Sequence, residues 1–356
     1  MNVLVLPLTT SEIPGIGGRF KVKPEDFEVE EIPSYEPVGE GVHVYLWLEK
    51  TGVPMDVALR RVAKVLGGRS SDLGHAGIKD TRAVTRQWIS VLDEQGALDT
   101  EQSPETVDLG PGLRIVRWAR HGNRLRTGHL RGNRFRVLIR EPSTGAAQRA
   151  EQKLTRLASV GAPNFYGPQR FGRDGATLAL GLGILADTLT GKARKASRDR
   201  FRRRLAVSAV QSHLFNDYLI QRLALGQERT VLRGDWMCHR PHGQLFEAVD
   251  VEAEQARVDS GETLVTGPMF GHKMSLATGE SGAFESEVLA QSGLSTDSFA
   301  AVGKLGRGTR RPLLVYPDEV GVDEVDDGVE VRFSLPSGSY ATVVLREIMG
   351  EQEEQA

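Results

Sequence analysis

One short stretch of the sequence, residues 75–88, combines residue types that could do chemistry. Gly77 permits a close backbone approach or a positive φ, and Asp80 lies between the cations Lys79 and Arg82. Nearby positive charge favours the ionised form of a carboxylate, and an ionised loop carboxylate can act as a nucleophile or a general base. The alternative is that Asp80 caps the following turn and pairs with Lys79 or Arg82 at the surface. The spacing alone leaves both interpretations open.

Other stretches predict no phosphate loop, metal site or serine nucleophile. One Gly-rich stretch fails as a phosphate-binding loop, because Ala186 stands at its first Gly and Ala193 at the Ser or Thr that would hold Mg²⁺. Cys238, His239 and His242 have no further good ligand nearby. Zinc needs about four ligands, or three plus water. Neither a Gly-x-Ser-x-Gly turn nor a His-Glu-x-x-His motif is present.

The composition predicts a soluble globular protein of the cytoplasm. The chain has 356 residues, enough for one large domain or two of moderate size. No apolar run approaches the ~20 residues of a membrane helix, and the first ten residues lack the features of a signal peptide. Cys238 is the single cysteine, which excludes an internal disulfide and fits a reducing compartment.

The net charge of −2 hides an uneven distribution of charge. Residues 114–140 contain nine Arg and no acid, and residues 192–204 contain eight basic residues and one acid. Acidic residues gather elsewhere, including residues 249–262 and 318–327. Two basic stretches on a near-neutral chain predict contacts with a phosphate backbone. The alternative is that they form solvated faces of helices and strands.

Hydrophobic periodicity predicts a mixture of strands and helices. Val42, Val44, Leu46 and Leu48 alternate with His43, Tyr45 and Trp47, and similar period-two patterns occur in residues 134–139 and 329–335. Helical spacing marks residues 55–66, 146–160, 205–225 and 340–349. Because no strict βαβ rhythm appears, we expect an α+β fold with a mostly antiparallel sheet.

The segment of residues 163–305 differs in character from the rest of the chain. It opens rich in Gly and Arg, carries a long helix and then continues with turn-rich, weakly periodic sequence. We therefore expect a catalytic domain formed by residues 1–162 and 306–356, the latter ending in an acidic tail. Residues 163–305 are expected to form an inserted domain.

The sequence resembles the TruD family of tRNA pseudouridine synthases. The resemblance spans nearly the whole chain, in the family's order, and is weakest in residues 222–306. The blocks that carry it are Lys23-Pro24-Glu25-Asp26-Phe27-x-Val29-x-Glu31, Gly77-x-Lys79-Asp80-x-x-Ala83-x-Thr85-x-Gln87-Trp88, Gly132-Asn133-x-Phe135, Pro163-Asn164-Phe165-Tyr166-Gly167-x-Gln169-Arg170-Phe171-Gly172, Ser208-Ala209-x-Gln211-Ser212-x-Leu214-Phe215-Asn216 and Phe333-x-Leu335-Pro336-x-Gly338-Ser339-Tyr340-Ala341-Thr342-x-Val344-Leu345-Arg346-Glu347. Phe165-Tyr166 replaces the Tyr-Phe that is commoner in the family.

The resemblance implies a fold and an activity. The fold is a pseudouridine synthase core, with a mostly antiparallel mixed sheet flanked by helices and an inserted α/β domain that contacts RNA. The activity is isomerisation of a uridine of tRNA, at position 13, to pseudouridine. This reaction requires neither a cofactor nor a metal, and we expect a monomeric cytoplasmic enzyme.

The resemblance also assigns roles to individual residues. Asp80 is the nucleophile, Lys21 is its basic partner, and Phe135 is the pocket aromatic on which the base stacks. Lys79 and Arg82 remain competing partners for Asp80, and Phe135 could instead belong to the core, since it alternates with other apolar residues. Further substrate-binding residues are expected at Phe27, Lys79, Arg82, Asn133, Gln169, Arg170, Arg202, Arg203 and Arg204.

Two rival functions follow from the same features. The basic stretches alone would permit a non-catalytic RNA-binding or RNA-chaperone protein that retains the synthase fold. Such a degenerate protein would be expected to lose Asp80, Lys21 or Phe135, and all three are present. A hydrolase acting on a glycosidic bond would usually need a second carboxylate, and none lies in the motif around Asp80.

Overall fold

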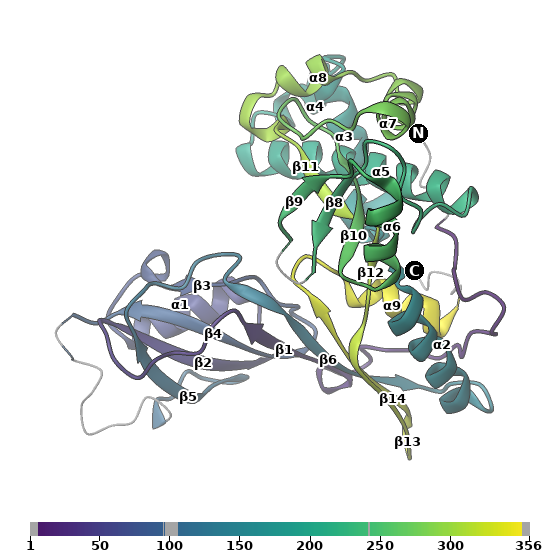
Figure 1. Ribbon diagram of the computed structural model, residues 1–356. Coiled ribbons are helices and arrows are strands. Elements are labelled where there is room, and N and C mark those ends of the chain that lie inside the picture. The colour runs from purple at the N-terminus through teal and green to yellow at the C-terminus, as the bar shows by residue number, and fades with distance from the viewer. Residues whose placement is uncertain (1–5, 95, 97–105, 241–242, 351–356) are drawn as a thin grey trace. The chain divides into compact units, whose positions relative to one another are not determined.

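The chain forms two units, each with its own sheet (Figure 1). The computed structural model describes residues 6–94, 96, 106–240 and 243–350. The first unit, here called the sheet unit, comprises Thr10–Val160 and the described residues from Tyr316 onward. The second, the insertion unit, comprises Gly161–Val315 and the described residues before Thr10. The predicted insertion, residues 163–305, lies within the insertion unit.

An eight-stranded sheet organises the sheet unit. Seven strands follow the order β13-β14-β6-β1-β4-β2-β5, and β3 pairs with β4 off this path. Among the described strands of this sheet, β1 and β4 pair in parallel and the other pairs are antiparallel. The strands are β1 (Phe27–Pro33), β2 (His43–Thr51), β3 (Gly74–His75), β4 (Val84–Leu92), β5 (Leu113–His121), β6 (Leu130–Arg140), β13 (Asp318–Val325) and β14 (Gly328–Pro336). This mostly antiparallel sheet with flanking helices confirms the predicted α+β class.

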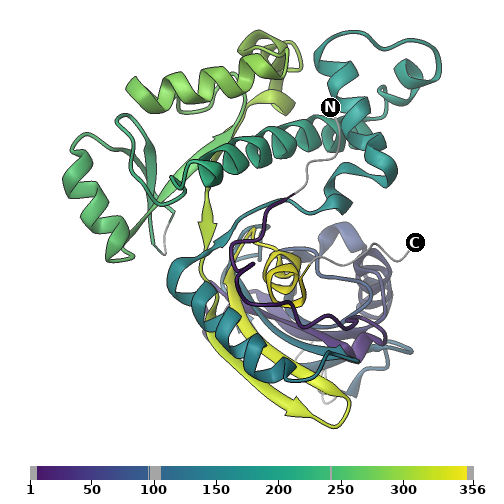
Figure 2. The ribbon, with the colours of Figure 1, turned by 90° about the vertical axis from the view of Figure 1, so that its right-hand side faces the viewer.

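One face of the sheet is apolar because helices cover it. Helix α1 (Met55–Val65) packs Ala58 and Val62 against the cluster that contains Leu46 and Ile89. Helix α2 (Ala146–Val160) covers β13 and β14, and α9 (Ala341–Met349) packs against α2 (Figure 2). The period-two pattern of β2, β6 and β14 thus points its apolar residues at these helices. We call this side the covered face.

A buried polar link ties the C-terminal helix to the start of the unit. Glu347 of α9 accepts hydrogen bonds from the main chain and hydroxyl of Thr10, at 3.0 and 2.7 Å. Lys153 of α2, which is 1% exposed, donates to the main-chain oxygen of Thr10 at 2.8 Å. These bonds satisfy polar groups that would otherwise be buried without partners.

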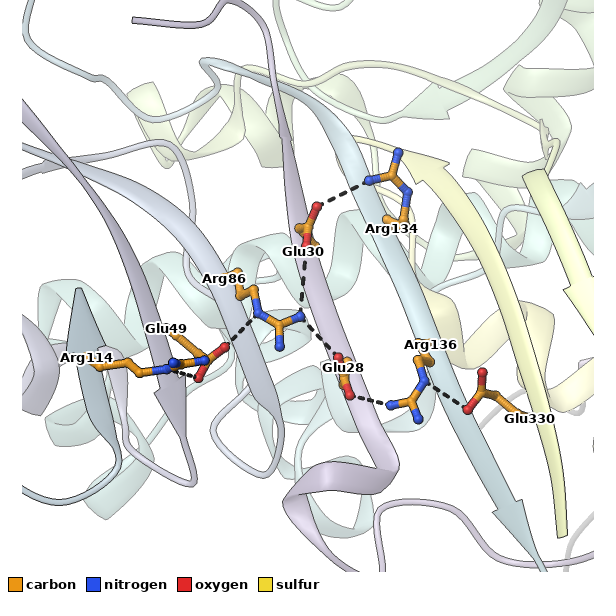
Figure 3. Close-up of polar contacts among 8 residues, drawn as sticks. All are labelled: Glu28, Glu30, Glu49, Arg86, Arg114, Arg134, Arg136 and Glu330. Carbon is orange, nitrogen blue, oxygen red and sulfur yellow. Dashed lines mark hydrogen bonds and ion pairs between the residues drawn. The ribbon is translucent and has the colours of Figure 1, made fainter. Parts of the chain in front are cut away.

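The opposite face of the sheet carries a ladder of ion pairs across six strands (Figure 3). Arg86 on β4 joins Glu49 of β2 at 2.7 Å and Glu28 of β1 at 3.1 Å. Arg134 and Arg136 of β6 extend the ladder, and its remaining members in Figure 3 are Arg114, Glu30 and Glu330. Opposite charges on neighbouring strands stabilise the sheet and leave this face with little net charge.

The Arg-rich stretch of residues 114–140 is therefore mostly neutralised. Six of its nine Arg form ion pairs with carboxylates, and two more donate to main-chain oxygens. Arg140, for example, contacts Asp26 at 2.7 Å and lowers the pKa of that buried carboxyl. Carboxylates that are distant in the sequence thus meet this stretch in the fold, and its contact with an RNA phosphate backbone stays a prediction.

The insertion unit combines a small sheet with several helices. Its four-stranded sheet has the order β11-β10-β8-β9, and β7 pairs with β12. The strands are β7 (Ala162–Pro163), β8 (Trp236–His239), β9 (Leu245–Glu247), β10 (Thr263–Met269), β11 (Thr309–Pro312) and β12 (Leu314–Val315). The helices are α3 (Ala176–Leu185), α4 (Gly191–Ala196), α5 (Arg200–Ala224), α6 (Val251–Asp259), α7 (Gly279–Gln291) and α8 (Thr296–Ala300). Across the described residues of both units, no helix is long and apolar enough to cross a membrane.

Candidate active site

The loop that carries Asp80 joins β3 to β4 and lies on the covered face of the sheet unit. Its main chain is anchored at several oxygens. Gln87 Nε2 of β4 donates to the oxygen of Gly77 at 2.9 Å, and Lys50 Nζ of β2 donates to the oxygen of Asp80. The amide of Gly52 donates to the oxygen of the residue that precedes β4, at 3.2 Å. Side chains and amides of the sheet therefore fix the path of this loop.

Lys79 points into the protein rather than toward Asp80. Its side chain is only 4% exposed, and Nζ lies 2.6 Å from Asn133 Oδ1 and 3.3 Å from Glu31 Oε2. Glu31 is fully buried and also accepts a hydrogen bond from the amide of Trp88 at 3.3 Å. Burial raises the pKa of Glu31 and lowers that of Lys79, although each charge favours the other's ionised form. Lys79 thus joins the loop to β1 and β6.

Lys21 is the residue that pairs with the carboxylate of Asp80. Lys21 Nζ lies 2.8 Å from Asp80 Oδ1, and the Asp80 side chain remains 46% exposed. The same ammonium lies 3.9 Å from the centre of the Phe27 ring, within the range of a cation–π interaction. Lys21 adopts a φ of 58°, a left-handed conformation that costs a non-glycine residue about 1–2 kcal/mol. Such strain is typical of residues whose position is fixed by function.

Arg82, the other alternative partner, does not reach Asp80. Its side chain is exposed and forms no ion pair with any described residue. Among the described residues, neither of the two cations nearest in sequence forms an ion pair with the carboxylate, and the residue that does is 59 positions away. Among the three candidate partners, the structure brings only Lys21 into contact with the Asp80 side chain.

A line of aromatic rings leads from Lys21 into the core. The rings of Phe27 and Phe135 are 6.1 Å apart, and those of Phe135 and Phe333 are 5.4 Å apart. Phe27, Phe135 and Phe333 are 1%, 4% and 0% exposed. Phe135 is therefore buried in the core, as its alternation with other apolar residues had suggested as the alternative to a pocket role. Its stacking on a base stays a prediction.

The second basic stretch differs from the first because no described carboxylate forms an ion pair with its Lys and Arg side chains. Arg202, Arg203 and Arg204 lie in the first turn of α5, and their side chains form no ion pair with the described residues. Positive side chains are unfavourable at a helix N-terminus. Asp199 partly offsets this by accepting a hydrogen bond from the amide of Arg202 at 2.7 Å. A costly and unneutralised cluster is typical of a surface that binds an anion.

Two further residues that were predicted to contact RNA, Gln169 and Arg170, lie in the insertion unit on the short turn Pro168–Phe171. Arg170 is held against α5, where it donates to Ser208 Oγ at 2.5 Å and to Ser212 Oγ at 3.3 Å. Gln169 is exposed. Arg170 therefore has a structural role within the insertion unit, and RNA contacts of both residues stay predictions.

The Cys and His residues considered as metal ligands do not gather into a site. Cys238 is buried, and His239 Nδ1 lies 3.2 Å from Arg257. His242 lies outside the described residues. Within the part of the chain that the structure describes, no group of three or more His, Cys, Asp or Glu could hold a metal ion.

Three residues that bind the loop carrying Asp80 were not among the predicted site residues: Glu31, Lys50 and Gln87. Gln87 and Glu31 stood within the family blocks, but their burial beneath the loop could not be read from those blocks. Lys50 had a clearer signal. It continues the alternation of Leu46 and Leu48, so it places a lysine where the covered face requires an apolar residue.

We predict that Glu31→Met lowers the free energy of unfolding by roughly 3–5 kcal/mol, because it leaves the Lys79 ammonium buried without its carboxylate. The loss should shrink as pH rises, since the unpaired amine can then release its proton. Urea titrations between pH 6 and 9 measure both effects.

The matched control is Glu31→Met combined with Lys79→Met, which removes both charges. We expect the double variant to be more stable than the single variant at pH 6. A single variant as stable as wild type would show that the pair does not hold the loop.

Comparison with known proteins shows similarity over nearly the whole chain. The sequence matches the family described as tRNA pseudouridine synthase D (TruD) over residues 6–196 and 191–348. The tRNA pseudouridine synthase D of Anaeromyxobacter dehalogenans (strain 2CP-1) is 43% identical over 98% of this chain and 97% of its own length. That of Thermus thermophilus is 42% identical over 96% of this chain and 92% of its own length. A crystal structure from Methanosarcina mazei, titled for the same family, superposes with a TM-score of 0.72 at 25% identity, covering 97% of this chain and 96% of that one. The chain belongs to the tRNA pseudouridine synthase D (TruD) family.

Proposed function

We propose that this protein isomerises a uridine of tRNA to pseudouridine, with Asp80 as the nucleophile. The observation that carries the proposal is that Asp80 has a half-exposed carboxylate and is held at both its side chain and its main chain. Lys21 holds its side chain at 2.8 Å, and Lys50 holds its main chain. An ionised carboxylate that is open to solvent but held in one position is suited to attack on a bound nucleotide.

The chemistry needs one carboxylate and no external reactant. The N1–C1′ bond of the uridine breaks, the base turns, and C5 forms the new bond to C1′. The hydrogen of C5 leaves to solvent and N1 takes up a proton, so that product and substrate have the same composition. Asp80 would either attack C1′ or assist formation of a glycal, and both routes require its ionised form.

The target base must leave its stack before Asp80 can reach C1′. This costs a few kcal/mol, which stacking on an aromatic ring can offset by about 1–3 kcal/mol. Phe135 is the proposed stacking residue, and Phe27, whose ring lies beside it, supports Lys21. Asn133 is proposed to contribute through Lys79, whose ammonium it binds at 2.6 Å. Phe135 is 4% exposed, so the bound base would have to approach the small part of this residue that is open to solvent.

We place recognition of the tRNA body on the basic stretch of the insertion unit. Arg202, Arg203 and Arg204 are not neutralised by described residues, and they gather in one helical turn. Double-helical RNA is recognised mostly by its shape and by contacts to its phosphates, and three neighbouring Arg side chains can supply phosphate contacts. Position 13 as the target, a monomeric state and a cytoplasmic location stay predictions.

We predict that the wild-type protein forms pseudouridine in unmodified tRNA and that Asp80→Ala does not. Carbodiimide modification followed by primer extension locates the pseudouridine, and we expect it at position 13. Filter binding of the same tRNA to both proteins serves as the control. Tight binding without pseudouridine in either protein would favour the rival, a non-catalytic RNA-binding protein.

A second prediction concerns the basic turn of α5. Replacing Arg202, Arg203 and Arg204 by Gln should weaken tRNA binding and reduce the slope of log K against log salt by about 2–3. The rate at saturating tRNA should change little, because Asp80 and its supports are untouched. Filter-binding titrations at salt concentrations from about 50 to about 200 mM give the affinity and the slope.

A matched control replaces three Arg that already pair with carboxylates. Arg60, Arg156 and Arg332 lie 2.9, 2.9 and 2.5 Å from Asp56, Glu12 and Asp323. Their replacement by Gln changes the net charge equally but should leave the salt slope close to that of wild type. Identical slopes for the two triple variants would refute a special role for the basic turn.

A further inference from the structure

Lys50 is a charged residue in an apolar position. It lies on β2, where it shares the covered face with Leu46 and Leu48, and it is 1% exposed. Its cross-strand neighbours, Thr85 of β4 and Leu113 of β5, carry no charge. Burying an ammonium among such groups is costly unless something compensates for it.

The compensation that Lys50 receives comes from the catalytic loop. Its ammonium donates a hydrogen bond to the main-chain oxygen of Asp80, and among the described residues no carboxylate forms an ion pair with it. Burial lowers the pKa of Lys50 to about 8. The charge of Asp80 opposes this shift and that of Lys79 adds to it. A buried lysine that pairs with a single carbonyl stabilises the fold less than an apolar residue of similar size would.

We propose that Lys50 is a positioning residue for the nucleophile, which it serves by fixing the Asp80 main chain and placing a second positive charge beside its carboxylate. This inference rests on the proposed function. Lys21 and Lys50 then act on two ends of one residue, Lys21 on the carboxylate and Lys50 on the peptide. Other hydrogen bonds hold the loop at Gly77 and at the residue before β4, but the Lys50 bond is the one that holds the peptide of Asp80 between them. A displacement of about 1 Å can cost about 100-fold in rate.

The effect of replacing Lys50 on the melting temperature distinguishes a positioning role from a structural one. The pKa of Lys50 falls from 10.5 in the unfolded chain to about 8 in the fold. Between these values the unfolded chain binds more protons, so the contribution of Lys50 to stability rises with pH. Below pH 8 the fold bears the full cost of the buried charge. A neutral replacement should therefore raise the melting temperature at pH 7, with the gain fading toward pH 10.5.

The test is Lys50→Met, which keeps the length of the side chain and removes its charge. We expect kcat for pseudouridine formation in unmodified tRNA to fall about 10- to 100-fold, with KM within about twofold of wild type. We expect the melting temperature at pH 7 to be higher than that of wild type. In wild type, kcat should decline as pH rises through about 8, and this decline should be missing from Lys50→Met.

Lys153→Met is the matched control, because Lys153 is also 1% exposed and also donates to a main-chain oxygen, that of Thr10 at 2.8 Å. It should alter the melting temperature but leave kcat unchanged. The inference is overturned if Lys50→Met keeps kcat within about twofold of wild type, if its loss of activity accompanies a lowered melting temperature, or if the alkaline decline persists in it. Wild-type protein that makes no pseudouridine would instead refute the proposed function.

Discussion

Two buried ammonium groups support the loop on which the proposed chemistry depends. Burial of a positive charge is unfavourable, and both Lys50 and Lys79 have pKa values lowered by it. Lys50 lies on the sheet and donates a hydrogen bond to the main-chain oxygen of Asp80 in the loop. Lys79 lies in the loop and binds Asn133 and Glu31 of the sheet. The chain therefore accepts a cost in stability on the covered face, and in return an exposed carboxylate is held in place. Such a balance is typical of functional sites.

The positive charges of the two units differ in whether carboxylates neutralise them. Arg86, Arg114, Arg134 and Arg136 meet carboxylates on neighbouring strands, and this ladder leaves the sheet face opposite the covered face with little net charge. The basic turn of α5 in the insertion unit has no such partners among the described residues. A net charge of −2 is thus compatible with a nucleic-acid partner, because a local surplus, rather than the total, attracts phosphate.

How far the sequence predicts the structure depends on the range of the interactions. Local alternation correctly placed the strands around Leu46, Phe135 and Phe333, and it was sufficient for the α+β class. Pairing between distant strands was beyond it, so the ion pair of Arg134 with Glu319, 185 positions apart, appeared only in the fold. The Lys21–Asp80 pair came from family resemblance, because residues 59 positions apart share no local pattern. Lys50 was detectable in principle, as a lysine in an apolar register, but its partner is a main-chain atom that no motif encodes.

Release of tritium from tRNA that carries 5-³H-uridine tests the central claim most directly. Isomerisation moves the glycosidic bond to C5, so each converted uridine must lose the hydrogen of C5 to water. With enzyme in excess over an unmodified tRNA transcript, we expect stoichiometric release by the wild-type protein. Asp80→Asn, which keeps the shape of the side chain but not its charge, should bind the transcript and release none above background. Equal release by the two proteins would contradict the account, because the reaction would then proceed without the Asp80 carboxylate.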